Sequence, residues 1–340
     1  MCAQWILVDC PVYSRNNRHR LQRLQITSLT PSDAPELLSL YQSLYPTLGW
    51  SESYLRWQYF ENPAGHAQVW VARDAGQIVA SYAAVPLRLY IDGHVNIGWR
   101  VQDVLTRREY RGRGLYHELS ATAARFLFDS AYPLNVTFPN EHSHKAFIRM
   151  GWVQAFQLPL RVCGDTSAVR RQPVAAEVVS INGFDRRAEQ VWASHVRRSG
   201  LGVDRSVAHL NWRYCSNPKS EYARFHLSLD GSEAILVLKY FQREDGSRWS
   251  HLVDLFQSEP GSALTESAFG HWVNVSLEQT CKFMSCWAVS TSPLDPILSR
   301  AGFVSPPGFN RWLLVNANAD VPYHTEERRW HLAMGDSDVF

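Results

Sequence analysis

The chain has 340 residues, of which 45% are hydrophobic and 19% charged. At roughly 150 residues per domain this length predicts about two domains, and the composition excludes a disordered chain, a collagen-like repeat and a coiled coil. The 34 lysines and arginines against 32 acidic residues leave a net charge of +2, which provides no overall field to attract nucleic acid or an anionic membrane. We therefore expect no nucleic-acid partner, and specificity has to come from a local site.

The start of the chain predicts an extension rather than a targeting signal. Residues 15–23 are rich in arginine but lack interleaved aromatic residues, so we interpret residues 1–22 as an N-terminal extension and assign it no function. Residues 1–12 are a poor signal peptide, and no stretch reaches the eighteen or so apolar residues of a membrane span. We expect a cytoplasmic protein without membrane insertion. The six cysteines have no zinc-site spacing, so we expect reduced thiols and no metal.

Residues 32–151 alternate between helical and strand patterns. Apolar residues recur at helical spacing behind a Pro/Ser/Asp start at 31–33, and Ala75-Gly76 and Asp92-Gly93 indicate hairpin turns. The predicted elements are a helix at 32–45, strands at 68–72 and 78–90, a strand ending near 106, a helix at 114–130, a strand at 134–138 and a short helix at 143–150. This order predicts an α/β domain with a mixed, largely antiparallel twisted sheet flanked by helices.

An internal repeat divides the chain. Residues 54–63 recur as 209–218 with five of ten positions identical, at an offset of 155 (212 − 57). Further on, residues 101–105 match 252–256, and 150–153 match 301–304, at an offset of 151 (254 − 103). A repeat of this length predicts one fold used twice.

The repeat and the linker composition between its copies predict five segments. Residues 164–179 have the Pro, Gly and polar content of a linker. The predicted order is the extension at 1–22, a first domain at 23–163, the linker at 164–179, a second domain at 180–318 and a C-terminal tail at 319–340.

A glycine turn, Arg111-Gly112-Arg113-Gly114, lies directly after a predicted strand and directly before a predicted helix. Glycines let the backbone approach a ligand closely, and the free amides and dipole of the following helix favour negative charge in the turn. The two arginines add positive charge, which makes a suitable cradle for a pyrophosphate. The turn is neither a Walker loop nor a GxGxxG motif, and a purely structural turn is an alternative of similar weight.

Four segments carry a resemblance to a known family: Val104-Leu105-Thr106, Tyr110-Arg111-Gly112-Arg113-Gly114-Leu115, Asn140-x-x-Ser143 and Phe147-x-x-x-Gly151-Trp152. Together they resemble the acetyl-CoA-binding motifs of the GNAT N-acetyltransferase superfamily. One position departs from the family pattern, because Tyr116 stands where a small residue is usual. The resemblance covers roughly residues 24–160, and the second half of the chain resembles a faint copy, so it implies two tandem GNAT-like domains.

The resemblance implies acetyl-CoA as the co-substrate and no metal. It implies that the splayed strand bonds the pantetheine arm, that the turn and helix start hold the pyrophosphate, and that the second motif touches the cofactor. The implied cofactor-binding residues are Val104, Leu105, Thr106, Arg111, Gly112, Arg113, Gly114, Leu115, Tyr116, His117, Asn140 and Ser143. In the second repeat the turn is replaced by Ser262, Ala263 and Thr265, so we expect that domain to have lost cofactor binding.

Acyl transfer to an amine needs a group that accepts the amine proton, because an amine with a pKa of about 10.4 is almost fully protonated at pH 7. Asp103, on the predicted cofactor strand, is the candidate, with a structural role as the alternative that Asp254 in the second copy supports. Many relatives protonate the thiolate with a tyrosine where this chain has Phe147. Tyr116 or His117 could serve instead, or the thiolate could leave directly.

The end of the chain supports one more hypothesis. A related aminoglycoside acetyltransferase family places its terminal carboxylate in the active site, so residues 336–340 could return to the cleft of the first domain, with a frayed tail as the alternative.

The predicted function is that of an acyl-CoA-dependent N-acetyltransferase acting on the primary amine of a small molecule. The chain resembles tandem-GNAT proteins of bacterial polysaccharide and amino-sugar modification, which suggests an amino sugar or a nucleotide-linked amino sugar as the acceptor. The alternatives are a tRNA-dependent aminoacyl or peptidyl transferase of the tandem-GNAT kind and a non-catalytic acyl-CoA-binding module. The oligomeric state stays open.

Overall fold

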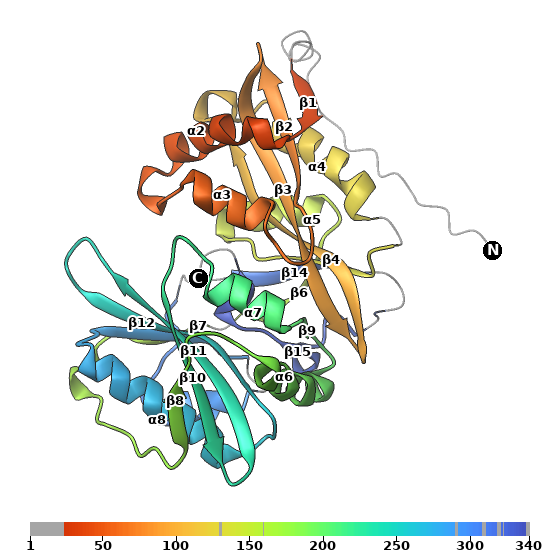
Figure 1. The fold of residues 1–340 in the computed structure, drawn as a ribbon. Helices are drawn as coiled ribbons and strands as arrows, with labels where there is room; N and C mark the ends of the chain where they lie inside the picture. Colours follow the sequence, from red (N-terminus) through yellow and green to blue (C-terminus); the bar gives the residue numbers. More distant parts are fainter. Residues whose placement is uncertain are drawn as a thin grey trace.

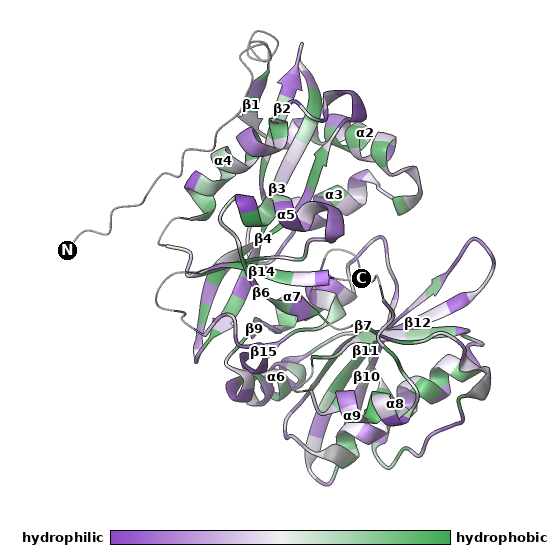
Figure 2. Ribbon diagram, turned by 180° about the vertical axis from the view of Figure 1, so that it is seen from behind, coloured by the Kyte–Doolittle hydropathy of each residue, from purple (hydrophilic) through white to green (hydrophobic). Residues whose placement is uncertain are grey.

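The computed structural model describes residues 24–128, 131–158, 160–289, 292–307, 311–317, 321 and 323–337. They form two α/β units, each a twisted mixed sheet flanked by helices, which confirms the predicted fold class (Figure 1). Figure 2 shows hydrophobic residues on the central strands, whereas the helices that flank them carry both hydrophobic and hydrophilic residues. No helix in these ranges is long and apolar enough to cross a membrane.

The first sheet has the strand order β1-β2-β3-β4-β5-β14-β6, with β9 and β15 continuing from one end of β3. Its ladders are antiparallel except for β4 with β5 and β9 with β15. Its strands are β1 (Gln25–Ser28), β2 (Gln68–Asp74), β3 (Gln77–Ile91), β4 (His94–Thr106), β5 (Leu134–Thr137), β6 (Val153–Leu158), β9 (Leu201–Val203), β14 (Arg311–Ala317) and β15 (Trp330–His331).

Helices cover both faces of the first sheet, because alternate residues of each strand point to opposite sides. On β2, Val69 and Val71 pack against two helices, and Trp70 and Ala72 pack against another on the opposite face. The first pair of helices is α2 (Ala34–Leu44) and α3 (Glu52–Tyr59); the other face carries α4 (Leu115–Leu127) and α5 (Glu141–Arg149).

The second sheet has the order β7-β13-β12-β11-β10-β8. Its strands are β7 (Leu160–Cys163), β8 (Glu177–Ser180), β10 (Tyr222–Leu229), β11 (Ser232–Gln242), β12 (Arg248–Gln257) and β13 (Phe283–Trp287). α8 (Ser262–Glu278) and α9 (Leu294–Arg300) pack on one face. α6 (Arg186–Ser199) and α7 (Val207–Tyr214) pack on the other, which faces the first unit. Short 3₁₀ turns are η2 (Pro31–Asp33), η3 (Pro46–Leu48), η4 (Arg108–Tyr110), η5 (Thr166–Ala168), η6 (Glu327–Arg329) and η7 (Met334–Asp336).

The two units exchange one strand each. β7 follows the first unit in the chain but pairs with β13 of the second sheet, and β14 follows the second unit but lies between β5 and β6 of the first sheet. The predicted boundaries near 163 and 318 therefore follow the order of segments along the chain. They do not follow the sheets, because β7 lies before the first boundary but in the second sheet, and β14 lies before the second boundary but in the first sheet. One hydrophobic core runs across the junction as a consequence.

The repeat found in the sequence lies where the units meet. Trp57 of α3 and Trp212 of α7 stack with ring centroids 4.5 Å apart and an interplanar angle of 15°. Each indole nitrogen donates to the main-chain oxygen of the other tryptophan, at 2.9 and 3.0 Å. This reciprocal pair is the contact expected of two copies related by an approximate twofold axis.

Candidate functional site

Strand β4 leaves its parallel neighbour β5 halfway along its length. The two strands pair only at Arg100 with Val136 and Val101 with Thr137. On the other side, the register with β3 shifts between Ser81 and Ala83, and Asp103 has a φ of 50°. This bulge bends the strand, so β4 diverges from β5 over its last residues. Those residues include Val104, Leu105 and Thr106, the predicted pantetheine contacts, which are all half-buried.

The glycine turn follows directly and opens helix α4. Gly112 and Gly114 have φ values of 72° and 84°, a left-handed conformation that costs glycine little. Gly114 is the N-cap of α4, and no side chain caps the helix there. The first amides of α4, from Leu115 onward, therefore lack intrahelical partners and point toward the turn with the positive end of the helix dipole. The turn and helix start make a suitable anion cradle.

Two arginines frame this cradle. Arg111 donates from Nε to the main-chain oxygen of Thr106 at 3.1 Å, and Arg113 donates to the main-chain oxygen of Glu109 at 2.6 Å. The guanidinium of Arg113 also lies over the ring of Tyr110, 4.9 Å from its centroid. These contacts use main-chain oxygens and a ring face, so both positive charges stay available to a phosphate.

The second predicted motif forms the start of α5, just past the end of β5. Asn140 is the N-cap, and its Oδ1 accepts from the amides of His142 at 3.0 Å and Ser143 at 3.1 Å. The Ser143 hydroxyl donates to the same oxygen at 3.2 Å. The structure thus gives Asn140 and Ser143 a capping function, and their predicted contact with the cofactor stays a prediction.

The two candidate proton donors, Tyr116 and His117, lie in different environments. Tyr116 points into the core, where its ring packs edge-on against Phe147 with centroids 6.0 Å apart. Its buried hydroxyl has no hydrogen-bond partner among the described residues, and burial raises the pKa of Tyr116 above its ordinary value. His117 is exposed on the first turn of α4. Neither environment identifies the group that protonates the thiolate, so the catalytic role of Tyr116 or His117 stays a prediction.

Asp103 is held by three donors. Its Oδ2 accepts from Gln58 Nε2 at 2.7 Å, from the Tyr59 hydroxyl at 2.7 Å and from Gln102 Nε2 at 2.9 Å. The second unit repeats one of these contacts, since the Tyr214 hydroxyl donates to Asp254 at 2.8 Å. The carboxylate of Asp103 is therefore fixed in place on the bulge, which suits both a structural role and a positioned proton acceptor.

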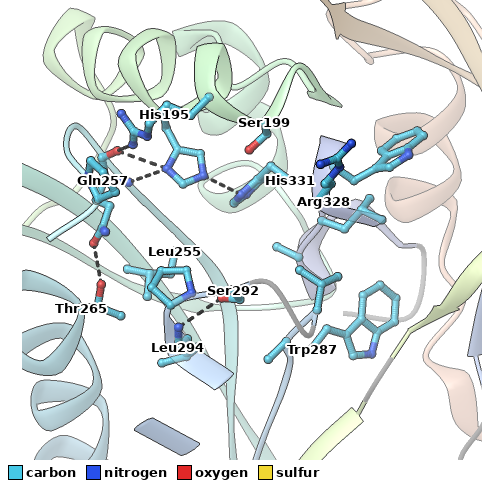
Figure 3. A pocket seen from close by; sticks show the side chains of 18 of the residues that line it. His195, Ser199, Leu255, Gln257, Thr265, Trp287, Ser292, Leu294, Arg328 and His331 are labelled. Atoms are coloured by element: carbon cyan, nitrogen blue, oxygen red, sulfur yellow. Dashed lines mark hydrogen bonds between the residues drawn. The ribbon is translucent and has the colours of Figure 1, made fainter. Parts of the chain in front are cut away.

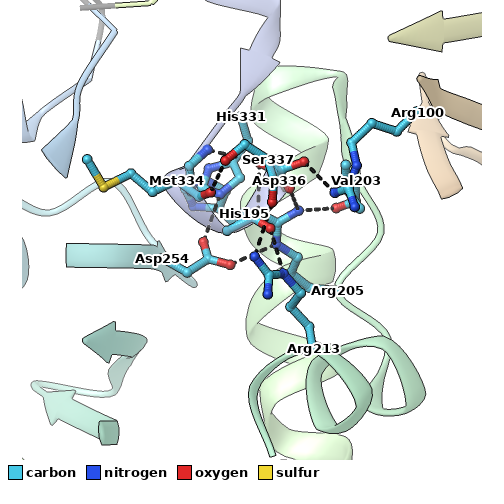
Figure 4. A network of polar contacts seen from close by, with 12 residues as sticks. Arg100, His195, Val203, Arg205, Arg213, Asp254, His331, Met334, Asp336 and Ser337 are labelled. Carbon is cyan, nitrogen blue, oxygen red and sulfur yellow. Dashed lines mark hydrogen bonds and ion pairs between the residues drawn. The ribbon is translucent and has the colours of Figure 1, made fainter. Parts of the chain in front are cut away.

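A buried polar network that the sequence did not indicate joins the two units (Figure 4). Arg100 of β4 donates to Gln102 at 2.7 Å and to the main-chain oxygen of Asp336 at 2.7 Å. Arg205 contacts Asp254 at 3.0 Å, and it contacts the two carboxylate oxygens of Asp336 at 2.7 and 3.0 Å. Burial by itself raises the pKa of Asp254, but Arg205 and His331 hold it below its ordinary range.

The same network seats the described part of the C-terminal tail. Arg213 donates to the main-chain oxygens of Gly335 at 3.0 Å and Ser337 at 3.1 Å. Asp336 and Ser337 are 2% and 1% exposed. Asp336 contacts Arg100 of β4, and Arg100 precedes Gln102, a donor to Asp103, by two positions. Residues 338–340 of the predicted tail lie outside the described residues. Only the repeat offset, which pairs Asp254 with Asp103, could have pointed to part of this network.

The second unit lacks an equivalent cradle. Gly261, the N-cap of α8, has an ordinary φ of −96°. The hydroxyl of Thr265, which stands at the position of Gly114, donates toward Gly261 and Gln257 within the unit. Among the described residues, no group of three or more His, Cys, Asp and Glu side chains could hold a metal.

Comparisons with known proteins agree with this geometry. Residues 25–155 match a family model described as an acetyltransferase (GNAT) domain, whereas no curated protein sequence matches the chain. A GCN5-related N-acetyltransferase from Anabaena variabilis is 13% identical with a TM-score of 0.65, over 87% of this chain and 73% of that one.

Two further solved structures are similar in fold. Saccharomyces cerevisiae N-myristoyltransferase with bound myristoyl-CoA is 10% identical with a TM-score of 0.60, over 87% of this chain and 83% of that one. A tandem GNAT protein from the clavulanic acid biosynthesis pathway is 14% identical with a TM-score of 0.58, over 86% of this chain and 98% of that one. The first unit thus matches a GNAT acetyltransferase domain model, and most of the chain is similar in fold to solved N-acyltransferases and to a tandem GNAT protein.

Proposed function

We propose that the protein is an acyl-CoA-dependent N-acyltransferase whose chemistry takes place in the first unit. One observation carries this proposal: the left-handed glycines Gly112 and Gly114 open an uncapped helix beside the point where β4 leaves β5. A phosphate cradle next to a free strand edge matches the shape and charge of an acyl-CoA. The acyl-CoA, when bound, supplies the acyl group as an activated thioester.

Different segments of the first unit are proposed to bind different parts of the acyl-CoA. The first amides of α4 and the guanidinium groups of Arg111 and Arg113 hold the pyrophosphate, where both charge and dipole favour an anion. The diverging end of β4, residues 104–106, offers main-chain groups to the pantetheine arm. Asn140 and Ser143 fix the start of α5 beside it.

The amine must lose a proton before it attacks, and Asp103 is the proposed acceptor of that proton. Its carboxylate is held by Gln58, Tyr59 and Gln102 at the bend of β4, so it is oriented before the substrate arrives. A preoriented acceptor costs no reorganisation during the reaction. The tail beyond Ser337 is the alternative source of a carboxylate, because the chain up to Ser337 is already buried against Arg213 and β4.

The thiolate is proposed to leave without a dedicated tyrosine donor. Phe147 has no proton to give, and the buried hydroxyl of Tyr116 has a raised pKa, which makes it a weaker acid. Direct release requires no donor, and His117 at the surface of α4 is the remaining candidate.

The finer identity of the substrates is also proposed. We propose acetyl-CoA as the donor and the primary amine of a small molecule, an amino sugar or a nucleotide-linked amino sugar, as the acceptor. This rests on the motif resemblance to tandem-GNAT proteins of polysaccharide modification. Four cysteines in the described part of the chain are free thiols, which agrees with the proposed cytoplasmic location.

Ligand-induced stabilisation tests the cofactor site. At an acetyl-CoA concentration of about 100 Kd, binding stabilises the folded state by about 2.7 kcal/mol, which at roughly 2–4 °C per kcal/mol raises Tm by roughly 5–10 °C. Gly114→Trp should abolish the shift because its side chain fills the turn. Gly261→Trp is the matched control, since Gly261 is the N-cap of α8 and its Cβ would meet nothing within 4 Å.

A second variant tests the same site without replacing a left-handed glycine such as Gly114, so backbone strain does not affect its result. Arg111→Glu reverses an exposed charge and should reduce the shift while leaving the Tm of the ligand-free protein unchanged. No shift in the unmodified protein would overturn acyl-CoA binding and favour a tRNA-dependent transferase. A shift without thiol release from any of a panel of amino sugars and other amines would favour a non-catalytic acyl-CoA-binding module.

A further inference from the structure

A cavity of about 260 Å³ lies between the second sheet, helix α6 and residues 328–333 (Figure 3), and no residue of the glycine turn lines it. Strands β12 and β13 pair in parallel only as far as Leu252 with Cys286 and then diverge. The cavity opens at this divergence, between Leu255 and Gln257 on one strand and Trp287 at the end of the other. Helix α6 and residues 328–333 close the remaining sides.

The position of the cavity follows from the repeat. At the offset of 151, Leu252 and Leu255 correspond to Val101 and Val104, the residues at which β4 leaves β5. The second unit thus keeps the strand divergence of the first. It has lost the phosphate turn, because Gly261 has an ordinary φ and Ser262, Ala263 and Thr265 stand where the first unit has Arg111, Gly112 and Gly114. A ligand of this cavity therefore needs no pyrophosphate.

The lining predicts the chemistry of that ligand. Its floor and sides are largely apolar, with Leu252, Leu255, Trp287, Leu294 and Leu332 among them. Such a surface suits an aliphatic or aromatic body of modest size.

Two cations complete the lining. Arg198 and Arg328 both face the cavity, and among the described residues no aspartate or glutamate lines it. Arg198 is held by main-chain oxygens, at 2.6 Å from Ser258 and 2.8 Å from Gln257. Arg328 pairs with Glu326 at 3.0 Å, with both side chains exposed, and a solvent-exposed pair of this kind contributes little to stability. A ligand carboxylate can take the place of Glu326 at little cost.

We propose that this cavity binds a small amphipathic monoanion, an apolar body that carries one carboxylate, in the manner of a medium-chain fatty acid anion. The apolar body fills the space between β12 and β13, and the carboxylate meets Arg328 at the rim. The site is separate from the acyl-CoA cradle and does not depend on the acyltransferase proposal.

The ligand would also contact the network that joins the units. His331 lines the cavity, and its Nε2 lies 3.3 Å from Asp254 while its Nδ1 lies 2.9 Å from His195 Nε2. Asp254 is joined through Arg205 to Asp336, and Asp336 to Arg100 of the first unit. Occupation of the cavity therefore acts on the same contacts that hold the two units together, and the ligand should raise Tm.

Calorimetric titration of the full chain with sodium octanoate tests the proposal. Saturable binding is expected, and 1-octanol, which has the same body without the charge, should bind at least 10-fold more weakly. Ser199→Trp, at the end of α6, should abolish binding because the indole fills the cavity. Arg328→Gln should weaken it several-fold, and Arg197→Gln, an exposed arginine of α6 that does not line the cavity, is the matched control.

Three outcomes would overturn the proposal. They are no octanoate binding by the unmodified protein, equal binding by Ser199→Trp, and equal affinity for octanol, which would leave an apolar cavity without an anion site. Gly114→Trp should bind octanoate like the unmodified protein. Loss of octanoate binding in that variant would place the ligand in the cradle of the first unit instead, whatever the outcome of the acetyl-CoA experiment.

Discussion

Replacing Arg205 by methionine removes the cation that lies between Asp254 and Asp336. The three side chains are 1%, 0% and 1% exposed, and Arg205 approaches the two carboxylates to 3.0 and 2.7 Å. Methionine fills most of the space but leaves two negative charges buried beside each other. Breaking a buried ion pair in this way costs about 3–5 kcal/mol, so Arg205→Met should lower the free energy of unfolding by at least that amount at pH 7.

The difference in unfolding free energy between the unmodified protein and Arg205→Met should depend on pH. In the unmodified protein, burial raises the pKa of Asp254, but Arg205 and His331 together lower it, so that it lies below the ordinary value. This depressed pKa contributes stability above the unfolded pKa of about 3.9, and the contribution is lost as pH falls toward the folded pKa. In Arg205→Met the strongest opposing charge is gone, so burial raises the folded pKa of Asp254 against His331 alone and stability is lost as pH rises above about 4. The difference between the two proteins should therefore narrow between pH 7 and pH 4.5.

Urea unfolding followed by tryptophan fluorescence at pH 7, 5.5 and 4.5 measures this difference. Arg197→Met, at an exposed position of α6, controls for the loss of an arginine. The double variant Arg205→Met/Asp254→Asn should recover part of the lost stability, because it removes one of the two buried carboxylates that have lost Arg205. A loss below about 1 kcal/mol at pH 7, well under the range for a broken buried pair, or a difference that does not change with pH, would refute the reasoning.

Two further predictions concern contacts between the units. A Cβ at Gly335 would overlap the hydroxyl of the buried Tyr214, so Gly335→Ala should lower Tm sharply. Gly164→Ala, whose Cβ meets nothing within 4 Å, should not lower Tm. Equal Tm values for the two variants in calorimetry would contradict this prediction. The stacked Trp57 and Trp212 should be energetically coupled by about 0.5–1.5 kcal/mol, so Phe substitutions in a double-mutant cycle of urea unfolding should be non-additive. Additive losses would show that the reciprocal contact does not join the units.

Much of the first unit could be predicted from local sequence patterns. The helix predicted at 32–45 forms as α2 at Ala34–Leu44, and the strand predicted at 134–138 forms as β5 at Leu134–Thr137. The turn at Gly112 and Gly114 was also predictable, because a left-handed backbone is a local requirement that glycine meets. Helix α3 was missed as an element, although its Trp57 had identified the repeat.

The candidate site was predictable only in its local parts. The cradle and the cap at Asn140 depend on neighbours within a few residues. The burial of Tyr116 against Phe147 depends on how α4 and α5 lie on the sheet, and a motif position cannot show it.

By itself the sequence determined the fold class, the repeat and the location of the glycine turn before α4, because periodicity, turn chemistry and self-similarity are properties of short segments. The tertiary structure alone decided that β14 enters the first sheet and β7 the second. It alone decided that Arg205 contacts both Asp254 and Asp336, which lies 131 residues further along the chain than Arg205. The physical reason is that strand exchange and buried ion pairs are selected by the free energy of the whole packed chain. Their partners are distant in sequence, and no local pattern marks them before the units come together.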